Sequence, residues 1–209
     1  MTKIILVRHG ETEWNQRGIF QGQLNSDLTE TGHVQATAIA QRLQKHNFDF
    51  LYSSDLNRAQ ETAKPISKAC DLPLQLDEGL RERHYGIFQG LEKSRVSDIH
   101  SEAYAEHKSG NPRYVIPKGE SMLQFQKRVW TCLENLAEQH EGKSLVIVTH
   151  GGTIAVIFYK ILKMDLSLKR PFSTTNTCYN EIYRSADGWI LKVLGDTSHL
   201  SSTGREDVV

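Results

Sequence analysis

The sequence contains little cysteine and no long hydrophobic run. Its 209 residues include cysteines only at positions 70, 132 and 178, which is too few and too widely spaced for a disulfide framework or a CxxC motif. No apolar stretch approaches the roughly 18 residues that cross a bilayer, and the short run at residues 4–7 ends at Arg8, unlike a signal peptide. We therefore expect a reduced, cytoplasmic protein with no membrane partner.

The chain also lacks an excess of charge of either sign. Lysine plus arginine and aspartate plus glutamate both total 25, so the formal net charge is zero. A general nucleic-acid binder would carry a basic excess, so we expect no nucleic-acid partner, although a small basic pocket fits this balance. The length favours one domain, residues 1–209, and leaves open whether the chain forms homo-oligomers.

Strand-like and helix-like stretches alternate along the chain. The expected strands are residues 4–7, 48–52, 73–76, 144–149, 179–183 and 189–194, the last two joined by a turn at Asp187-Gly188. The expected helices are residues 30–46, 58–70, 121–139 and 153–163, with a kink or new start at Pro65. Because the strands are apolar throughout, we expect an α/β fold: a single three-layer α/β/α domain around a mostly parallel central sheet.

Local patterns predict helix caps, buried faces and a cap over a site. Asp27-Leu28-Thr29 and Ser53-Ser54-Asp55 are expected to cap the first two helices. The buried faces are expected to hold Val34, Ala38, Ile39 and Leu43 in the first helix, and Met122, Phe125, Val129, Leu133 and Leu136 in the third. Glycines and prolines interrupt residues 83–118, so we expect this segment to form a small cap of loops around one helix.

Two of the expected strands end in a histidine followed by glycine. Arg8 and His9 follow the first strand in LVRHG (residues 6–10), and His150 follows the late strand in VIVTHGG (residues 146–152). Ligands bind at the carboxyl ends of strands in open α/β sheets, so His9 and His150 should meet at one edge. Arg58 lies in the first helical turn after another strand, where anions are favoured. These side chains together would form a compact phosphate pocket.

Two other interpretations of these residues are weaker. Paired histidines also bind metals, but the sequence lacks HExxH or another tight ligand spacing, and Arg8 beside His9 would repel a cation. Gly142-Lys143-Ser144 is similar to the end of a P-loop, but position 137 is alanine and the segment precedes a strand instead of following one. We therefore expect no metal site and no P-loop.

Five motifs together resemble the histidine phosphatase superfamily, in its phosphoglycerate-mutase-like branch. They are LVRHGETEWN (6–15), DLTETG (27–32), SSDLNRAQETA (53–63), LRERHYG (80–86) and THGG (149–152). The resemblance implies that His9 is a nucleophile forming a phosphohistidine and that Glu82 is the general acid. Arg8, Arg58 and His150 would stabilise the transferring phosphoryl group without a metal or other cofactor.

The resemblance also implies contacts to the phosphate or to the rest of the substrate. These would come from Asn15, Gln21, Gly22, Tyr85, Lys93, Gly151 and Gly152. The simpler interpretation of Glu82 is that it merely pairs with Arg81 or Arg83.

The motifs divide between two activities of this family. Tyr85 and Lys93 resemble substrate residues of phosphoglycerate mutases, which would use 2,3-bisphosphoglycerate as a primer. The following segment is shorter than in the mutases, with only Arg113 in place of a paired arginine, and PKGES (117–121) resembles the phosphatases. We favour a metal-independent phosphatase acting on a small phosphorylated metabolite. A cofactor-dependent phosphoglycerate mutase and a non-catalytic phospholigand-binding protein are the alternatives.

Overall fold

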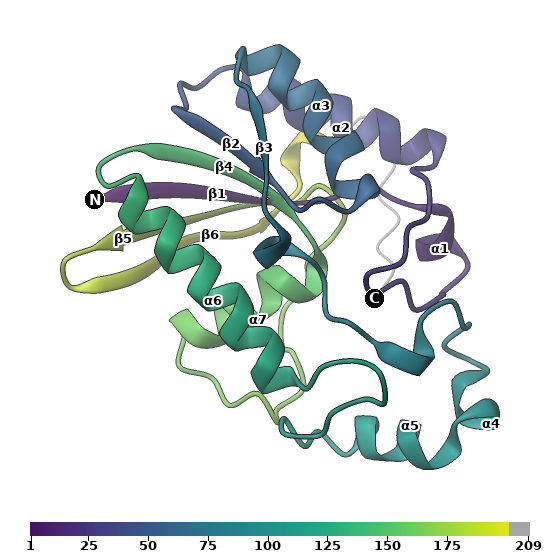
Figure 1. The fold of residues 1–209 in the computed structure, drawn as a ribbon. Helices are drawn as coiled ribbons and strands as arrows, with labels where there is room; N and C mark the ends of the chain where they lie inside the picture. Colours follow the sequence, from purple (N-terminus) through teal and green to yellow (C-terminus); the bar gives the residue numbers. More distant parts are fainter. Residues whose placement is uncertain (201–209) are drawn as a thin grey trace.

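The computed structural model describes residues 1–200, and a six-stranded mixed sheet forms its centre (Figure 1). The strand order is β3-β2-β4-β1-β5-β6, in which the first four are parallel and the last two form an antiparallel hairpin. The strands are β1 (Thr2–Arg8), β2 (Phe50–Ser53), β3 (Leu74–Leu76), β4 (Ser144–Thr149), β5 (Tyr179–Ser185) and β6 (Gly188–Asp196). The expected α/β architecture is confirmed.

Helices cover both faces of the sheet (Figure 1). α2 (Glu30–Leu43) and α3 (Asn57–Cys70) cover one face, and α6 (Met122–Gln139) and α7 (Gly151–Ile161) cover the other. Alternate residues of β1 therefore enter different cores: Ile4 and Leu6 pack with α6 and α7, whereas Ile5 and Val7 pack with α2 and α3. Burial on both faces explains why the sequence of this strand is apolar without alternation.

The register of the two central strands places the two histidines at one edge. Arg8 at the end of β1 lies opposite Thr149 at the end of β4, and the His9 backbone N–H donates to the Thr149 carbonyl at 2.8 Å. His9 and His150 therefore leave the sheet side by side, as their strand-end positions predict.

The first long helix ends earlier than expected, and the buried face holds Ile39 and Leu43 as predicted but not Val34. α2 ends at Leu43, and Val34, expected inside, is 50% exposed. A Cβ on Gly32 would lie 2.1 Å from the Glu11 carbonyl oxygen, so the helix packs its backbone directly against the loop after β1. This close approach rotates other residues inward: Gly32, Gln35 and Ala36.

α3 runs unbroken through Pro65, so the expected new start is wrong. The proline removes one backbone hydrogen bond, while packing of Ala59, Ala63 and Ile66 on the sheet holds the helix together. The expected caps are also wrong here: the N-cap residue is Leu56, with no side-chain cap, because Ser54 and Asp55 have tertiary partners. Thr29, in contrast, caps α2 as expected, since its hydroxyl accepts from the Gly32 N–H at 3.0 Å.

The segment between β3 and α6 holds two short helices instead of one. α4 (Val96–Ile99) and α5 (Ser101–Lys108) are separated at His100, whose backbone is not helical. The segment has its own small apolar cluster, distinct from the two sheet cores, around Phe88, Val96 and Ile116. The remaining helical elements are α1 (Glu13–Gln16) and the 3-10 turns Glu78–Leu80, Gly86–Phe88 and Ser198–Leu200.

Two expectations rested on what the sequence lacks. Cys70, Cys132 and Cys178 are all free thiols. Within residues 1–200, no helix combines the length and apolar character needed to cross a bilayer. The expected single domain spans residues 1–209, of which residues 201–209 lie outside the described part of the chain.

Candidate active site

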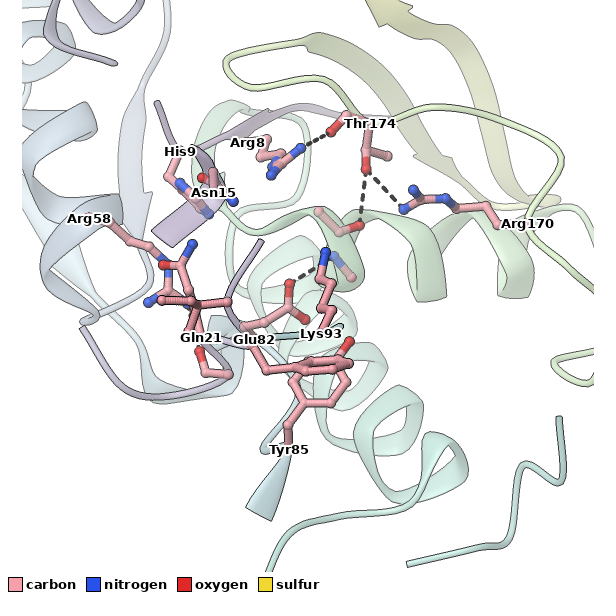
Figure 2. A pocket seen from close by; sticks show the side chains of 15 residues that line it. Arg8, His9, Asn15, Gln21, Arg58, Glu82, Tyr85, Lys93, Arg170 and Thr174 are labelled. Carbon is pink, nitrogen blue, oxygen red and sulfur yellow. Dashed lines mark hydrogen bonds between the residues drawn. The ribbon is translucent and has the colours of Figure 1, made fainter. Parts of the chain in front are cut away.

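A cavity of about 220 Å³ opens at the carboxyl edge of the sheet (Figure 2). All the residues predicted from sequence line it except His150, which packs behind His9 with 5.2 Å between the ring centroids. The lining residues are Arg8, His9, Asn15, Ile19, Phe20, Gln21, Gly22, Arg58, Glu82, Tyr85, Lys93, Gly151, Gly152, Arg170 and Thr174.

His9 is held with one ring nitrogen facing the cavity. Its Nδ1 lies 2.7 Å from the Gly10 carbonyl oxygen, which only accepts, so Nδ1 carries the proton and Nε2 keeps a lone pair. Burial holds the pKa of His9 well below its ordinary value, and the Arg58 and Arg8 guanidiniums lower it further. The neutral imidazole is therefore the stable form at neutral pH, as a nucleophile requires.

Backbone contacts fix the turn that carries His9. The Gly10 N–H donates to Thr62 Oγ1 at 2.9 Å, and Asn176 Nδ2 donates to the His9 carbonyl at 2.9 Å. A Cβ on residue 10 would lie 2.6 Å from the Gly32 carbonyl oxygen, so only glycine fits between β1 and α2.

His150 presents an unused donor beside His9. Ser54 Oγ accepts from the Leu56 N–H at 3.3 Å and lies 2.8 Å from His150 Nε2. The hydroxyl can donate its proton to Nε2, and we assign this arrangement, in which the imidazole proton lies on Nδ1. Nδ1 is buried and has no partner among residues 1–200. Burial, followed by the Arg58 charge, lowers the pKa of His150, so this donor is neutral.

The two arginines are fixed by carbonyl groups, and in each the Nε donor is left without a partner in the described chain. Arg8 Nη1 donates to the Thr174 carbonyl at 2.6 Å, and Arg58 donates to the Gly22 and Leu24 carbonyls at 2.6 and 2.7 Å. The Nε atoms of both are buried without a partner in the described chain. Burial lowers the pKa of Arg58 to about 10, which leaves it charged at neutral pH. Buried cationic donors without acceptors indicate a site for an anion.

The loop after β1 supplies the other side of this pocket. Gln21 donates from Nε2 to Thr12 Oγ1 at 2.7 Å, and Thr12 forms a capping box with Asn15. Gly22 has a φ of +55°, and a Cβ there would meet the Gln89 side chain at 2.1 Å. Glycine at this position therefore allows the sharp turn whose carbonyl groups hold Arg58.

Two backbone N–H groups hold the Glu82 carboxylate at the cavity. Its Oε1 accepts from the Arg83 N–H at 2.7 Å, and its Oε2 accepts from the Gly152 N–H at 2.9 Å at the start of α7. A Cβ on Gly152 would lie 2.2 Å from Oε1, so glycine is needed for this approach. The carboxylate is thus oriented by two backbone N–H groups beside the phosphate pocket.

The neighbouring arginines of Glu82 have other partners. Arg81 forms an ion pair with Asp55, including an Nε–Oδ1 hydrogen bond of 2.7 Å, and the Arg83 side chain donates to the Glu120 carbonyl. No ion pair in the described chain joins Glu82 to either of them. The simpler interpretation of Glu82, as the partner of these arginines, is therefore wrong.

Arg128 on α6 fixes the loop that carries Glu82, a role that no sequence pattern predicts. Its guanidinium donates to the carbonyls of Gly79, Arg81 and Glu82 at 3.0 to 3.2 Å, and to Glu120 Oε1 at 2.8 Å. A charged residue on an amphipathic helix is ordinarily a solvated one, and only the tertiary fold shows this role.

Tyr85 and Lys93 extend the cavity from the segment between β3 and α6. Tyr85 packs on Phe20, with 5.0 Å between ring centroids, and burial raises its pKa to about 12, so it stays a neutral hydrogen-bonding group. Lys93 Nζ lies 5.9 Å from the centre of the Phe20 ring, and burial with the nearby charges of Arg8 and Arg170 lowers its pKa.

Four lining residues were not predicted from sequence: Ile19, Phe20, Arg170 and Thr174. Arg170 and Thr174 lie in the irregular segment between α7 and β5, and Arg170 Nη1 donates to Thr174 Oγ1 at 3.1 Å. The only signal in that stretch was the arginine itself, because the segment has no periodicity and its placement depends on distant contacts.

The cavity has the parts needed for phosphoryl transfer and little that would hold a metal. It combines a neutral imidazole nitrogen, unpaired cationic donors and a carboxylate. Residues 1–200 contain no group of three or more histidine, cysteine, aspartate or glutamate side chains that could bind a metal ion.

Comparisons with known proteins agree with this geometry. The model of the histidine phosphatase superfamily (branch 1) matches residues 4–197. A metal-independent phosphoserine phosphatase of Arabidopsis thaliana is 41% identical over 207 residues, covering 98% of this chain and 85% of that protein. Phosphoglycerate mutase-like protein 4 of the same species is 40% identical over 207 residues, covering 97% and 88%.

Solved structures show the same relationship. A phosphoserine phosphatase mutant from Entamoeba histolytica, in complex with phosphoserine, matches with a TM-score of 0.86 and 34% identity over 96% of this chain and 100% of that one. The same phosphatase in complex with 3-phosphoglyceric acid matches with a TM-score of 0.86 and 33% identity over the same shares of the two chains. The chain described here therefore belongs to branch 1 of the histidine phosphatase superfamily.

Proposed function

We propose that this protein is a metal-independent phosphatase that hydrolyses small phosphomonoesters through a phosphohistidine on His9. The observation that carries the proposal is the hydrogen bond from His9 Nδ1 to the Gly10 carbonyl, which leaves the Nε2 lone pair free at the cavity. The unpaired donors of Arg8, Arg58 and His150 around it support the same reaction.

In the first step, the His9 Nε2 lone pair attacks phosphorus and the bond from phosphorus to the ester oxygen breaks. Arg8 and Arg58 compensate charge on the three transferring oxygens, and His150 Nδ1 donates to one of them. Glu82, which enters this step carrying a proton taken up from solvent, gives that proton to the departing alkoxide, which leaves as the alcohol.

In the second step, water attacks the phosphohistidine and inorganic phosphate is released. Glu82, now a carboxylate, accepts a proton from the water as the new P–O bond forms and the P–N bond to His9 breaks. His9 returns to its neutral form, and both Glu82 and His9 are ready for another cycle.

The relatives support a small phosphorylated metabolite as the substrate. One is a metal-independent phosphoserine phosphatase, and a solved neighbour binds phosphoserine. The mutase alternative is supported by the mutase-like relative, by the 3-phosphoglyceric acid bound to a neighbour, and by Tyr85 and Lys93 at the cavity. A non-catalytic role is the weaker alternative, since His9, Glu82 and His150 are all arranged for reaction.

Phosphate release and isomerisation, measured on one preparation, distinguish the two enzymes. We expect inorganic phosphate to be released from small phosphomonoesters such as phosphoserine faster than 3-phosphoglycerate is converted to 2-phosphoglycerate. The reason is that the segment between Glu82 and Gly119 is short, so water reaches the phosphohistidine. Both rates are measured with and without 2,3-bisphosphoglycerate. Primed isomerisation faster than phosphate release would show that the mutase assignment is the better one.

Chelators are expected to leave phosphate release unchanged. Positive charge around the cavity already comes from four side chains, Arg8, Arg58, Lys93 and Arg170. These side chains would repel a divalent cation. The measurement is the rate of phosphate release before and after dialysis against EDTA. Loss of activity that one added divalent ion restores would contradict the metal-independent mechanism.

Two further assignments accompany this function, one of the domain organisation and one of the location in the cell. We propose that residues 83–118 act as the cap of a single domain, supported by their separate apolar cluster and by Tyr85 and Lys93 at the cavity. We also propose a cytoplasmic location, supported by the three free cysteines.

A further inference from the structure

The turn that holds Arg58 is itself held by a side chain from a distant segment. The Gly22 and Leu24 carbonyls accept from the Arg58 guanidinium at 2.6 and 2.7 Å, so the position of Arg58 follows that of the turn. The N–H of Gln23, between those two residues, donates to Oε1 of Gln89 at 2.9 Å. Gln89 lies in the segment between β3 and α6, does not line the cavity and has no part in the mechanism above.

The same oxygen also contacts the loop that follows Glu82. Gln89 Oε1 accepts a second hydrogen bond from the Tyr85 N–H, at 3.2 Å. The Gln23 side chain strengthens the connection in the opposite direction, because its Nε2 donates to the Glu82 carbonyl at 3.1 Å. An amide oxygen has two lone pairs, and both are used here. Gln89 therefore joins the turn that holds Arg58 to the loop that carries Glu82.

Gln89 lies directly on the backbone of the turn. A Cβ at Gly22 would lie 2.1 Å from Gln89 Oε1, so the amide fills the space that a side chain there would need. The main chains beside it are also paired: the Gly90 N–H donates to the Phe20 carbonyl at 2.8 Å, and the Phe20 N–H donates to the Leu91 carbonyl at 2.9 Å. This pairing fixes the separation that the Gln89 side chain spans, and a side chain shorter by one methylene would withdraw the oxygen from both donors.

We propose that Gln89 is a positioning residue for phosphoryl transfer, which holds the turn at Gly22 and, through it, the guanidinium of Arg58. The inference rests on the proposed phosphatase function. Without the Gln89 oxygen, the Gln23 and Tyr85 N–H groups lose this partner, and the turn can move away from the second loop. The carbonyl groups that orient Arg58 would move with it. Electrostatic stabilisation of the transferring group depends on fixed donors, so a small displacement slows the reaction.

Three substitutions of Gln89 test whether the accepting oxygen matters. Gln89→Met keeps an unbranched side chain but removes the acceptor, and Gln89→Asn keeps the amide but withdraws it. We expect each to lower kcat/KM about tenfold, and equally for phosphoserine and nitrophenyl phosphate, because both substrates transfer the same group. Gln89→Glu should restore most of the loss, since a carboxylate oxygen can accept from the same two N–H groups.

A matched control removes a similar contact away from the cavity. The Gln126 side chain also bridges two segments, since its Nε2 donates to the Val156 carbonyl at 3.1 Å, and it does not line the cavity. Gln126→Met should leave kcat/KM unchanged for both substrates. A loss equal to that of Gln89→Met would show that any broken bridge slows the enzyme, which contradicts the assignment.

A double-mutant cycle with Arg58→Lys shows whether Gln89 acts through Arg58. Lysine has a single ammonium and cannot reproduce the planar contacts of the guanidinium with two carbonyl groups. In the Arg58→Lys background, Gln89→Met should therefore lower kcat/KM for nitrophenyl phosphate by less than about twofold, because residues of one network are not additive. A purely structural role for Gln89 would give the same loss in both backgrounds.

The assignment is wrong if Gln89→Met and Gln89→Asn both retain wild-type kcat/KM, or if Gln89→Glu loses as much as they do. It is also wrong if the loss falls mainly on phosphoserine, because Gln89 would then act on proton donation by Glu82, or if the full loss recurs beside Arg58→Lys. If the wild type releases phosphate from neither substrate, the phosphatase function fails separately. Wild type and Gln89→Met are then compared by calorimetric affinity for inorganic phosphate, and equal affinities overturn the assignment.

Discussion

Replacing His9 with alanine is expected to abolish phosphoryl transfer, with kcat falling by about 10⁴-fold or more. His9 presents the lone pair of its Nε2 at the cavity. The neighbouring His150 is not expected to replace it, because the Nε2 of His150 is hydrogen-bonded to Ser54 and its Nδ1 carries a proton in the assigned tautomer. The measurement is phosphate release from phosphoserine and nitrophenyl phosphate. Substantial turnover by His9→Ala would remove the covalent mechanism.

A second measurement on the same variant follows the intermediate itself. Wild-type protein quenched during turnover should carry phosphate in an acid-labile, base-stable form, as expected for phosphohistidine, and His9→Ala should carry none. His33→Ala is the matched control, since His33 is exposed on α2 and does not line the active-site cavity. It should retain both the phosphoenzyme and turnover. A phosphoenzyme that persists in His9→Ala would place the nucleophile at another residue.

His9→Ala also distinguishes an inactive enzyme from a protein that has lost its pocket. The free Nε donors of Arg8 and Arg58 do not depend on the His9 ring, since carbonyl groups hold both guanidiniums. We therefore expect the variant to keep its thermal stability and to bind phosphoserine without turning it over. Binding with no turnover in the wild type as well would favour the non-catalytic alternative.

The sequence predicted the parts of the fold and site that depend on local pattern. β1 and β4 are buried on both faces, so their apolar runs were unmistakable, and their parallel pairing brought His9 and His150 together. The position of Arg58 in the first turn of α3 was likewise predicted from the local sequence pattern. His9 and His150 directly follow strand ends, and Arg58 lies in the first turn of a helix, so the positions of all three follow from elements that the local pattern defines.

The parts that the sequence did not predict depend on contacts between distant segments. Val34 is exposed because the Gly32 backbone packs against Glu11, an approach that no spacing rule contains. Ser54 was expected to cap α3, but its hydroxyl lies against His150, almost 100 positions further along the chain. Arg170 reaches the cavity from an irregular segment, so its position follows from the folded chain and not from any period.

The role of Glu82 depends on the leaving group, which allows its proton transfer to be measured apart from its structural contacts. Glu82→Gln should lower kcat/KM for alkyl phosphates such as phosphoserine by about 10²-fold or more, the size of a general-acid contribution. Nitrophenyl phosphate should lose less than about tenfold, since nitrophenolate leaves with little protonation. We compare kcat/KM because it depends only on the steps up to departure of the alcohol. Slow hydrolysis of the phosphohistidine therefore does not mask the difference between alkyl phosphates and nitrophenyl phosphate.

The same substitution also disturbs the structure, and the comparison of substrates separates the two effects. Both oxygens of Glu82 accept backbone N–H groups, so the amide of glutamine must present its NH₂ to one of these donors. This loss of orientation applies to every substrate alike, whereas loss of the proton applies only to poor leaving groups. Glu120→Gln is the control, because Glu120 also accepts from a backbone N–H and from Arg128 but does not line the cavity. Equal losses on both substrates in Glu82→Gln would show that Glu82 orients the start of α7 and that another group protonates the alkoxide.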